Sequence, residues 1–417
     1  MRFTISMLIL LLVLAGCASQ KFIAEKGVFY PKEEAARLDG LTRLDIPVMA
    51  GAAGNMLATG DLQFLEGRAF LPVIVTSKAG SEPLTHSIIY ALDGADGAVL
   101  DTLVLTQDEY MKFNTLVAAR ELFIVGEQDT LLHVIKADKE LNIIQRYPID
   151  IHYKQIHYAG TAHDKFRIVV SDRFDNLFLY EFRTEDLTLE RSRLLSKGLE
   201  EGFDFSAEGR YLWALKLSEN LLSTVRFDLS AMNPDPAYKE FMIPVNMQSK
   251  FQVEIKGTAG DHIYLAYTEK EDPKYPEKVT TFKIIALDYN QETSTQKAFA
   301  ELPTTYQISP AGENVYFYSM QTDIKKALNT YGLAKASPDL QTFDPVVRFL
   351  ETDRKVKFNA LDEQVYKLAE HEGKLYFTGL YYQNMGKLKA GDTYLYRTSD
   401  NFRVQPQIFF GSFTPGH

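Results

Sequence analysis

The stretch "AEGRYLWALK", residues 207 to 216, predicts a tight turn followed at once by a buried strand. Gly209, between Glu208 and Arg210, favours the turn, and the aromatic and apolar residues from Tyr211 onward favour an extended chain. Six further segments repeat this order of polar turn and apolar, aromatic strand. They are "EGRAFLPVIV" (66 to 75), "AARELFIVG" (118 to 126), "AHDKFRIVVS" (162 to 171), "AGDHIYLAYT" (259 to 268), "AGENVYFYSM" (311 to 320) and "HEGKLYFTGL" (371 to 380).

Each unit continues with a strand, a tight polar turn and another strand, as in "LHVIKADKELNIIQRYPI" (132 to 149) and "LFLYEFRTEDLTLERSRLL" (177 to 195). The turn chemistry recurs in "KADKEL", "RTEDL", "KASPDL" and "RTSDNF". Four short strands therefore repeat with a period of roughly 45 to 55 residues, which is typical of a propeller blade. The sequence predicts an all-β chain folded as a seven-bladed β-propeller of four-stranded blades. A pair of β-sandwiches is the alternative fold.

The predicted propeller spans residues 62–413, after a short N-terminal segment at 17–61. All seven units run in the same strand order, so we expect a strand near "GVFY" (27 to 30) to close the ring on the last blade. "GAAGNMLATG" (51 to 60) is expected to be loop, and 32–38 and 322–329 are the candidate helices. The expected blades are 62–110, 113–151, 155–196, 200–247, 251–301, 304–350 and 365–413.

Two of the turns, in "FSAEGRYLW" from Phe205 and "ISPAGENVYF" from Ile308, have the pattern S-x-x-G. They resemble the S-P-D-G turn of WD40-like, TolB-type and lactonase-type propellers. Over most of residues 62–413 the resemblance is one of overall architecture. Because functionally unrelated proteins share this turn, it implies the fold and no particular activity.

The chain begins "MRFTISMLILLLVLAGC", with Arg2, an apolar run from Met7 to Leu14 and then the single cysteine of the sequence, Cys17. An apolar run this short does not span a bilayer, so the order predicts a cleaved secretory signal. "LAGC" (14 to 17) resembles the lipobox of bacterial lipoproteins. The resemblance implies removal of residues 1–16, a diacylglyceryl group on the sulfur of Cys17 and an acyl chain on its new amino terminus. An ordinary signal peptide with a chance cysteine is the alternative.

Two or more acyl chains anchor a protein stably to a membrane. Ala18 and Ser19, which follow Cys17, resemble the start of lipoproteins that are sorted to the outer membrane. We therefore expect a cell-envelope protein, lipid-anchored in the outer membrane. The formal net charge of −10, which becomes −11 without Arg2, disfavours nucleic acid as a partner.

Four long connections between the second and third strands of a unit are candidate binding loops. They are 76–87, 269–280, 320–331 and 381–392, and all are expected on the same face of the disc. Tyr267, Tyr318, Tyr381 and Tyr382 lie at the matching strand ends and are the candidate ligand-binding residues. They would form a stacking rim for a sugar or a clamp for a peptide, or, in the alternative, pack between neighbouring blades.

No catalytic residue, metal site or cofactor is predicted. His152, His157 and His163 invite a metal interpretation, but His152 and His157 are five residues apart and point to opposite faces of a strand, and neither has an acidic or histidine partner at a ligand spacing. Asp172, Asp175 and Asn176 resemble a calcium loop only loosely, and a turn closed by Asx hydrogen bonds is favoured. No nucleophile elbow, phosphate loop or zinc helix is present in the sequence. Trp213, the single tryptophan, is expected to fill the core.

These observations favour a membrane-anchored lipoprotein whose propeller is a binding or scaffold module for a protein or a glycan. An enzyme, a hydrolase or lyase acting on polysaccharide or lactone substrates, is the alternative. A lipoprotein with such a scaffold role would resemble the propeller lipoprotein of the outer-membrane protein assembly machine. That family has eight blades and regularly placed tryptophans, whereas this sequence has seven units and one tryptophan.

Overall fold

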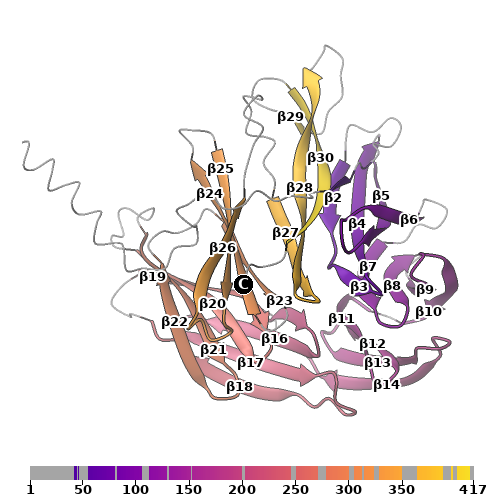
Figure 1. Ribbon diagram of the computed structural model, residues 1–417. Helices are drawn as coiled ribbons and strands as arrows, with labels where there is room; N and C mark the ends of the chain where they lie inside the picture. The colour runs from indigo at the N-terminus through magenta and orange to yellow at the C-terminus, as the bar shows by residue number, and fades with distance from the viewer. Residues whose placement is uncertain are drawn as a thin grey trace, which may run out of the picture.

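The computed structural model describes residues 42–44, 46, 55–79, 82–105, 112–128, 131–151, 153–199, 202–245, 250–270, 279–299, 305–311, 314–323, 328–349, 364–387, 396–397 and 402–413. Every regular element in these ranges is a strand. The strands form seven antiparallel sheets around a common axis, as Figure 1 shows. The chain is a seven-bladed β-propeller, which confirms the predicted fold class.

The first three blades are each built from one continuous piece of chain. Blade 1 contains β2 (Asn55–Thr59), β3 (Gln63–Leu65), β4 (Arg68–Ala79), β5 (Glu82–Asp93) and β6 (Val99–Leu105), and β2 and β3 together form its first strand. Blade 2 contains β7 (Lys112–Ala118), β8 (Leu122–Gln128), β9 (Leu131–Ala137) and β10 (Ile143–Ile149). Blade 3 contains β11 (Gln155–Ala162), β12 (Lys165–Ser171), β13 (Leu177–Arg183) and β14 (Leu189–Ser196).

Blades 4 to 6 have the same order. Blade 4 contains β15 (Asp204–Glu208), β16 (Tyr211–Ser218), β17 (Leu221–Asp228) and β18 (Ala237–Met242). Blade 5 contains β19 (Lys250–Ala259), β20 (His262–Lys270), β21 (Val279–Asp288) and β22 (Thr293–Phe299). Blade 6 contains β23 (Thr305–Ala311), β24 (Asn314–Asp323), β25 (Leu328–Ala336) and β26 (Phe343–Phe349). The first strands of successive blades contact one another, so they lie innermost around the axis.

Blade 7 closes the ring with a strand from the other end of the chain. It contains β27 (Gln364–His371), β28 (Lys374–Lys387) and β30 (Phe402–Phe413), with the short β29 (Tyr396–Arg397) beside β30. Its outer strand is β1 (Thr42–Leu44), which pairs antiparallel with Ile408–Phe410 of β30. The expected closing strand at 27–30 lies outside the described residues, and 42–44 fills the outer position.

Two buried glutamines hold the chain directly after β1. The side chain of Gln407 accepts a hydrogen bond from the backbone N–H of Ile46 at 2.7 Å, and that of Gln405 donates to the Ile46 carbonyl at 3.2 Å. These contacts satisfy the backbone groups of Ile46 much as a strand partner would. Leu44 and Ile46 are themselves buried between blades 7 and 1, so the closure joins the core.

Two other expectations are wrong. Asn55–Thr59, expected as loop, is strand β2, because β4 is twelve residues long and offers a pairing edge to it. The candidate helix at 322–329 falls in a hairpin instead, where Asp323 of β24 pairs with Leu328 of β25. The candidate helix at 32–38 lies outside the described residues.

The hydrophobic core lies between the blades. Each described cluster combines side chains from two adjacent sheets, because alternate residues of a strand point to opposite faces. In β12, for example, Phe166, Ile168 and Val170 face blade 2, while Val169 faces blade 4. Trp213 is fully buried between blades 4 and 5, which confirms its predicted role as a core residue.

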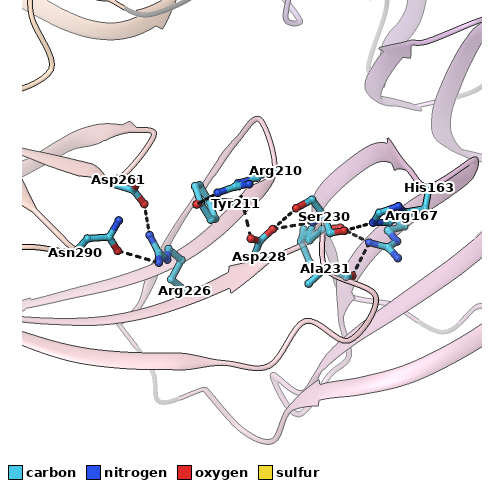
Figure 2. A network of polar contacts seen from close by, with 11 residues as sticks. His163, Arg167, Arg210, Tyr211, Arg226, Asp228, Ser230, Ala231, Asp261 and Asn290 are labelled. Carbon is cyan, nitrogen blue, oxygen red and sulfur yellow. Dashed lines mark hydrogen bonds and ion pairs between the residues drawn. The ribbon is translucent and has the colours of Figure 1, made fainter.

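Polar side chains join the blades at one face of the disc. In six of the seven seams described, a side chain of one blade donates a hydrogen bond to a backbone carbonyl in the turn between the third and fourth strands of the next. The donor and acceptor pairs are Arg68 and Lys139, Lys136 and Glu185, Arg167 and Ala231, Lys239 and Tyr289, Tyr264 and Pro338, and Tyr376 and Gly94, at 2.7 to 3.0 Å. Figure 2 shows two of these seams, around Arg167 and Arg226.

The seam between blades 3 and 4 contains a buried ion pair. The guanidinium of Arg167 contacts the Glu181 carboxylate at 2.7 Å, and both side chains are less than one-tenth exposed. The same guanidinium donates to the carbonyls of Leu229 and Ala231 across the seam. Three acceptor groups from two blades therefore converge on one cation.

The seam between blades 6 and 7 is built differently. Tyr316 occupies the position in its strand that Tyr264 and Tyr376 occupy in theirs, counted from the preceding turn. The outer strand of blade 7 arrives from the N-terminal side, so no chain turn connects its third and fourth strands. Burial raises the pKa of Tyr316 to about 12, and the nearby Glu370 carboxylate contributes.

We predict that Arg167→Met lowers the free energy of unfolding by about 3 to 5 kcal/mol, because it removes the buried cation beside the Glu181 carboxylate and leaves only the partly exposed Arg191 guanidinium, at 3.7 Å. The double variant Arg167→Met, Glu181→Leu should recover most of this loss, although the carbonyls of Leu229 and Ala231 still lack a donor. Urea denaturation of the two single variants and the double variant measures the coupling. A loss below about 1 kcal/mol for Arg167→Met would contradict the prediction.

Candidate functional site

The central channel is a large hollow in the described part of the molecule. A cavity of about 950 Å³ is lined by the inner strands of blades 1, 4, 5, 6 and 7. A second cavity of about 440 Å³ is lined by the inner strands of blades 1 to 4. Both are bordered by Asp61, Gln63, Ala207 and Gly209, so they are two parts of one channel.

One-residue bulges interrupt the inner strands of five blades. The pairing skips Asn114 in β7, His157 in β11, Lys256 in β19 and Tyr366 in β27. In blade 1 the three residues 60–62, between β2 and β3, stand opposite two residues of β4. A bulge re-aims a side chain and often lies next to a functional site. The described inner strands of blades 4 and 6 pair without such a shift.

The bulges bring polar residues to the channel wall. Asp61, His157 and Lys256 all border the channel. The ammonium of Lys367 in blade 7 lies 2.7 Å from the Asp61 carboxylate in blade 1, and that of Lys256 lies 2.6 Å from Glu254. The positive and negative groups of the wall therefore neutralise one another in pairs.

His157 is a bulge residue in a partly enclosed environment. Its Nε2 is 2.9 Å from the hydroxyl oxygen of Ser171, and its ring lies 4.0 Å from that of Phe205, centroid to centroid. Burial lowers the pKa of His157 to about 4. The imidazole is consequently neutral at neutral pH, and it can donate from one nitrogen and accept at the other.

The described parts of the expected binding loops are strand, and residues 271–278, 324–327 and 388–392 lie outside the described residues. The pairs β4–β5, β20–β21, β24–β25 and β28–β30 extend as ladders into these connections, with strands of 9 to 14 residues. The corresponding strands in blades 2, 3 and 4 have 7 or 8 residues. Strand pairing satisfies backbone groups that a loop would leave to water, which favours the longer ladders. In Figure 1 the hairpins β4–β5, β24–β25 and β28–β30 project toward the top of the view.

Two of the four predicted ligand-binding tyrosines are buried. Tyr267 is 1% exposed, and its hydroxyl donates to Glu269 while its ring stacks on Phe251 at 6.1 Å. Tyr318 is 4% exposed. Alternation along β20 turns Tyr267 into the apolar cluster between blades 4 and 5. This favours packing between blades; the side chains of Tyr381 and Tyr382 lie outside the described residues.

The other polar groups singled out in the sequence lie apart. Cys17 and His152 are outside the described residues, and His163 contacts the Ser230 carbonyl at 2.5 Å. Asp172 accepts hydrogen bonds from the N–H groups of Phe174 and Asn176, which confirms an Asx-bonded turn there. Among the described residues, no group of three or more His, Cys, Asp or Glu side chains is placed to hold a metal ion.

No helix in the described part of the chain is long and apolar enough to cross a membrane.

Comparison with known proteins assigns this chain to no family. No family model matches the chain, and no curated protein matches it. Solved structures with a similar fold include the β-propeller domain of the Trilobed protease from Pyrococcus furiosus, at 11% identity over 78% of this chain and 91% of that one, with a TM-score of 0.44. The WD40 domain of SCAP from fission yeast is 8% identical over 90% and 98%, with a TM-score of 0.39. The Pyrococcus horikoshii acylaminoacyl peptidase is 10% identical over 78% and 49%, with a TM-score of 0.43. At these values the similarities carry no argument about function.

The sequence singles out His157 only as a possible metal ligand and predicts none of the bulges. A bulge depends on the pairing of two strands, which a single segment does not display. One weak signal was present, since Gly60 and Gly257 lie beside two of the bulges and glycine within a strand pattern often marks one. Gly257 has a φ of +145°, a conformation that other residues rarely adopt.

We predict that His157 makes stability depend on pH. The unfolded chain binds a proton near the ordinary pKa of 6.5, whereas the folded chain binds it only near pH 4. The stability contributed by the neutral ring is therefore fully present above pH 6.5 and is lost as the pH falls toward 4. His157→Gln should lack this pH-dependent contribution to stability. The difference in unfolding free energy between the wild type and the variant should therefore narrow as the pH falls from 6.5 to 4. Parallel curves over that range would show the prediction to be wrong.

Proposed function

We propose that this protein is a membrane-anchored lipoprotein of the bacterial cell envelope and that its propeller is a scaffold that binds a partner protein. The anchor is the acylated Cys17 at the start of the mature chain, and the outer membrane is the proposed location. The proposal draws the anchor from the "LAGC" sequence at 14–17. The binding role is drawn from the distribution of long hairpins on the ring.

The observation that carries the binding role is the asymmetry of the disc. Blades 5, 6, 7 and 1 are consecutive around the ring, and each has a lengthened hairpin between its second and third strands. In each blade these hairpins leave the same face of the disc. Paired strands are more rigid than loops of the same length, so the four hairpins offer a preorganised surface on one side of the ring. Such an arrangement suits recognition of a protein over a broad area.

The tether leaves the ring at a defined place. The first described strand, β1, is the outer strand of blade 7, which carries one of the long hairpins. Between Cys17 and Thr42 the chain has 24 residues. Fully extended, these would span at most about 80 Å. The hairpin face is thus within reach of partners both at the membrane and in the space beside it.

We predict that Cys17→Ala releases the protein from the membrane or leaves it unprocessed, because the alanine cannot take a diacylglyceryl group. The measurement is fractionation after salt and carbonate washing, together with the mass of the N-terminal peptide. Ala18→Gly, which keeps the cysteine, is the matched control and should remain in the membrane fraction. Complete retention of processed Cys17→Ala in washed membranes would contradict the anchor.

We further predict that removing the hairpin end in blade 5 abolishes capture of a partner. Residues 271–278 are replaced by the two-residue turn Asn-Gly, which joins Lys270 to Val279 within the ladder of β20 and β21. The matched control replaces Glu219 and Asn220, the short connection between β16 and β17, with the same dipeptide. Glu219 already has a φ of +53°, so the control should fold as the wild type does.

The readout is crosslinking in intact cells, followed by purification and identification of the attached proteins by mass spectrometry. One protein that is recovered with the wild type and the blade 4 control, but not with the blade 5 variant, supports the proposed scaffold. Equal recovery of the partner with all three chains would show that the blade 5 hairpin is not part of the binding face.

A further inference from the structure

We propose that the outer edge of blades 1 and 2 rests on the membrane surface, so that the disc stands on its rim beside the bilayer. This inference rests on the membrane anchor proposed above, and it adds which surface of the propeller faces the lipid. That surface, the apolar rim, consists of the exposed apolar side chains of the outer strands β6 and β10. They are Val99, Leu100, Val104, Ile143, Ile144 and Tyr147.

Exposed apolar side chains are concentrated on outer strands in this protein. Within the described ranges, most of the large apolar side chains that are exposed belong to the fourth strands of blades 1 to 4. The fourth strand of blade 5, β22, has the sequence TSTQKAF and contributes none. Side chains of the apolar rim are 39% to 53% exposed, and Figure 1 shows β6 and β10 at the outer edge of the ring. Clustered exposed apolar side chains mark a protein or membrane contact.

The distribution of charge separates blades 1 and 2 from blades 3 and 4. β6 has one charged residue, Asp101, and β10 has one, Arg146, which is partly buried. β14 has three charged residues and β18 has two, including Arg193 and Lys239. Moving a charge toward lipid is costly, whereas apolar area and a tyrosine at the interface favour binding to a bilayer. The outer strands of blades 1 and 2 therefore match a lipid surface better than those of blades 3 and 4.

The proposed tether joins the ring beside the apolar rim. The hydroxyl of Thr42, at the start of β1, donates a hydrogen bond to the carbonyl of Asp96 at 3.5 Å. Only three residues after Asp96, β6 begins at Val99. Blades 3 and 4 are the farthest from blade 7 around the ring. A tether that enters next to blade 1 raises the local concentration of lipid at this edge, because the second contact becomes intramolecular.

The free edge of each sheet limits how deeply the apolar rim can lie. β6 and β10 are the last strands of their sheets, so one side of each backbone lacks a strand partner. Such backbone groups need water and are not tolerated in the hydrocarbon core of a bilayer. The apolar rim therefore lies at the level of the lipid headgroups. A disc supported on its rim has its axis parallel to the membrane, so the long hairpins face sideways and remain open to a partner.

The test is tryptophan fluorescence of the full-length acylated protein in phosphatidylcholine vesicles. The chain has one native tryptophan, Trp213, which is fully buried and gives a constant background. Val104→Trp and Ile144→Trp place reporters on the apolar rim, and Tyr238→Trp, on the outer strand of blade 4, is the matched control. Lipid brominated in the upper part of the acyl chain should quench the rim reporters by at least about half, because interfacial side chains reach about 5 to 10 Å into the headgroup boundary. The control should be quenched by acrylamide from the water and little by the brominated lipid.

A charge placed on the apolar rim tests the contact itself. Leu100→Glu, added to the Ile144→Trp variant, should reduce quenching by the brominated lipid at least about twofold, because a carboxylate resists transfer toward lipid. Met242→Glu, on the outer strand of blade 4, is the matched control and should leave the quenching unchanged.

Flotation of the vesicles separates this inference from the proposed anchor. Protein that floats with the vesicles, but whose reporters at positions 104 and 144 are quenched by the brominated lipid no more than the control, would overturn the docking of the apolar rim and leave the anchor intact. Rim reporters shielded from both quenchers would be covered by a second protein chain, which would also overturn it. Protein that does not float would contradict the anchor, and the docking with it.

Discussion

The hydrogen bond from a side chain of one blade to a turn carbonyl of the next is the interaction on which the ring depends. The six donors are chemically different, arginine, lysine or tyrosine, yet each reaches the turn between the third and fourth strands of the neighbouring blade. The apolar clusters in the seams are non-directional and would tolerate sliding of one sheet over another. The polar contacts at one face set the relative position of adjacent sheets, so each blade is placed by its neighbour.

The closure of the ring follows from the same constraint. Blade 7 has no chain turn between its third and fourth strands, because its outer strand is the N-terminal β1. The stabilising contacts are local to that blade: three paired residues, and the two glutamines that hold Ile46. The outer strand is also the place where the proposed membrane tether enters. Position of the tether and closure of the ring therefore depend on one short segment.

The two features that define candidate sites arise from irregularities of otherwise regular sheets. Bulges in the inner strands bring Asp61, His157 and Lys256 to the channel. Additional paired residues lengthen four hairpins, which project from part of one face of the disc. The tyrosines expected to form a binding rim were assigned by their place at the strand ends. Burial of Tyr267 and Tyr318 shows that the face a residue occupies matters more than its height along a strand.

The sequence by itself determined the fold class and the number of blades, because a polar turn followed by an apolar strand is a local pattern and seven copies of it are visible. It also placed Trp213 in the core. The closing strand at 42–44, the bulge at His157 and the register of the long hairpins were decided only by the tertiary structure. Each depends on which residue of a distant strand lies opposite, and a pairing partner such as Phe410 for Thr42 leaves no mark on either segment alone.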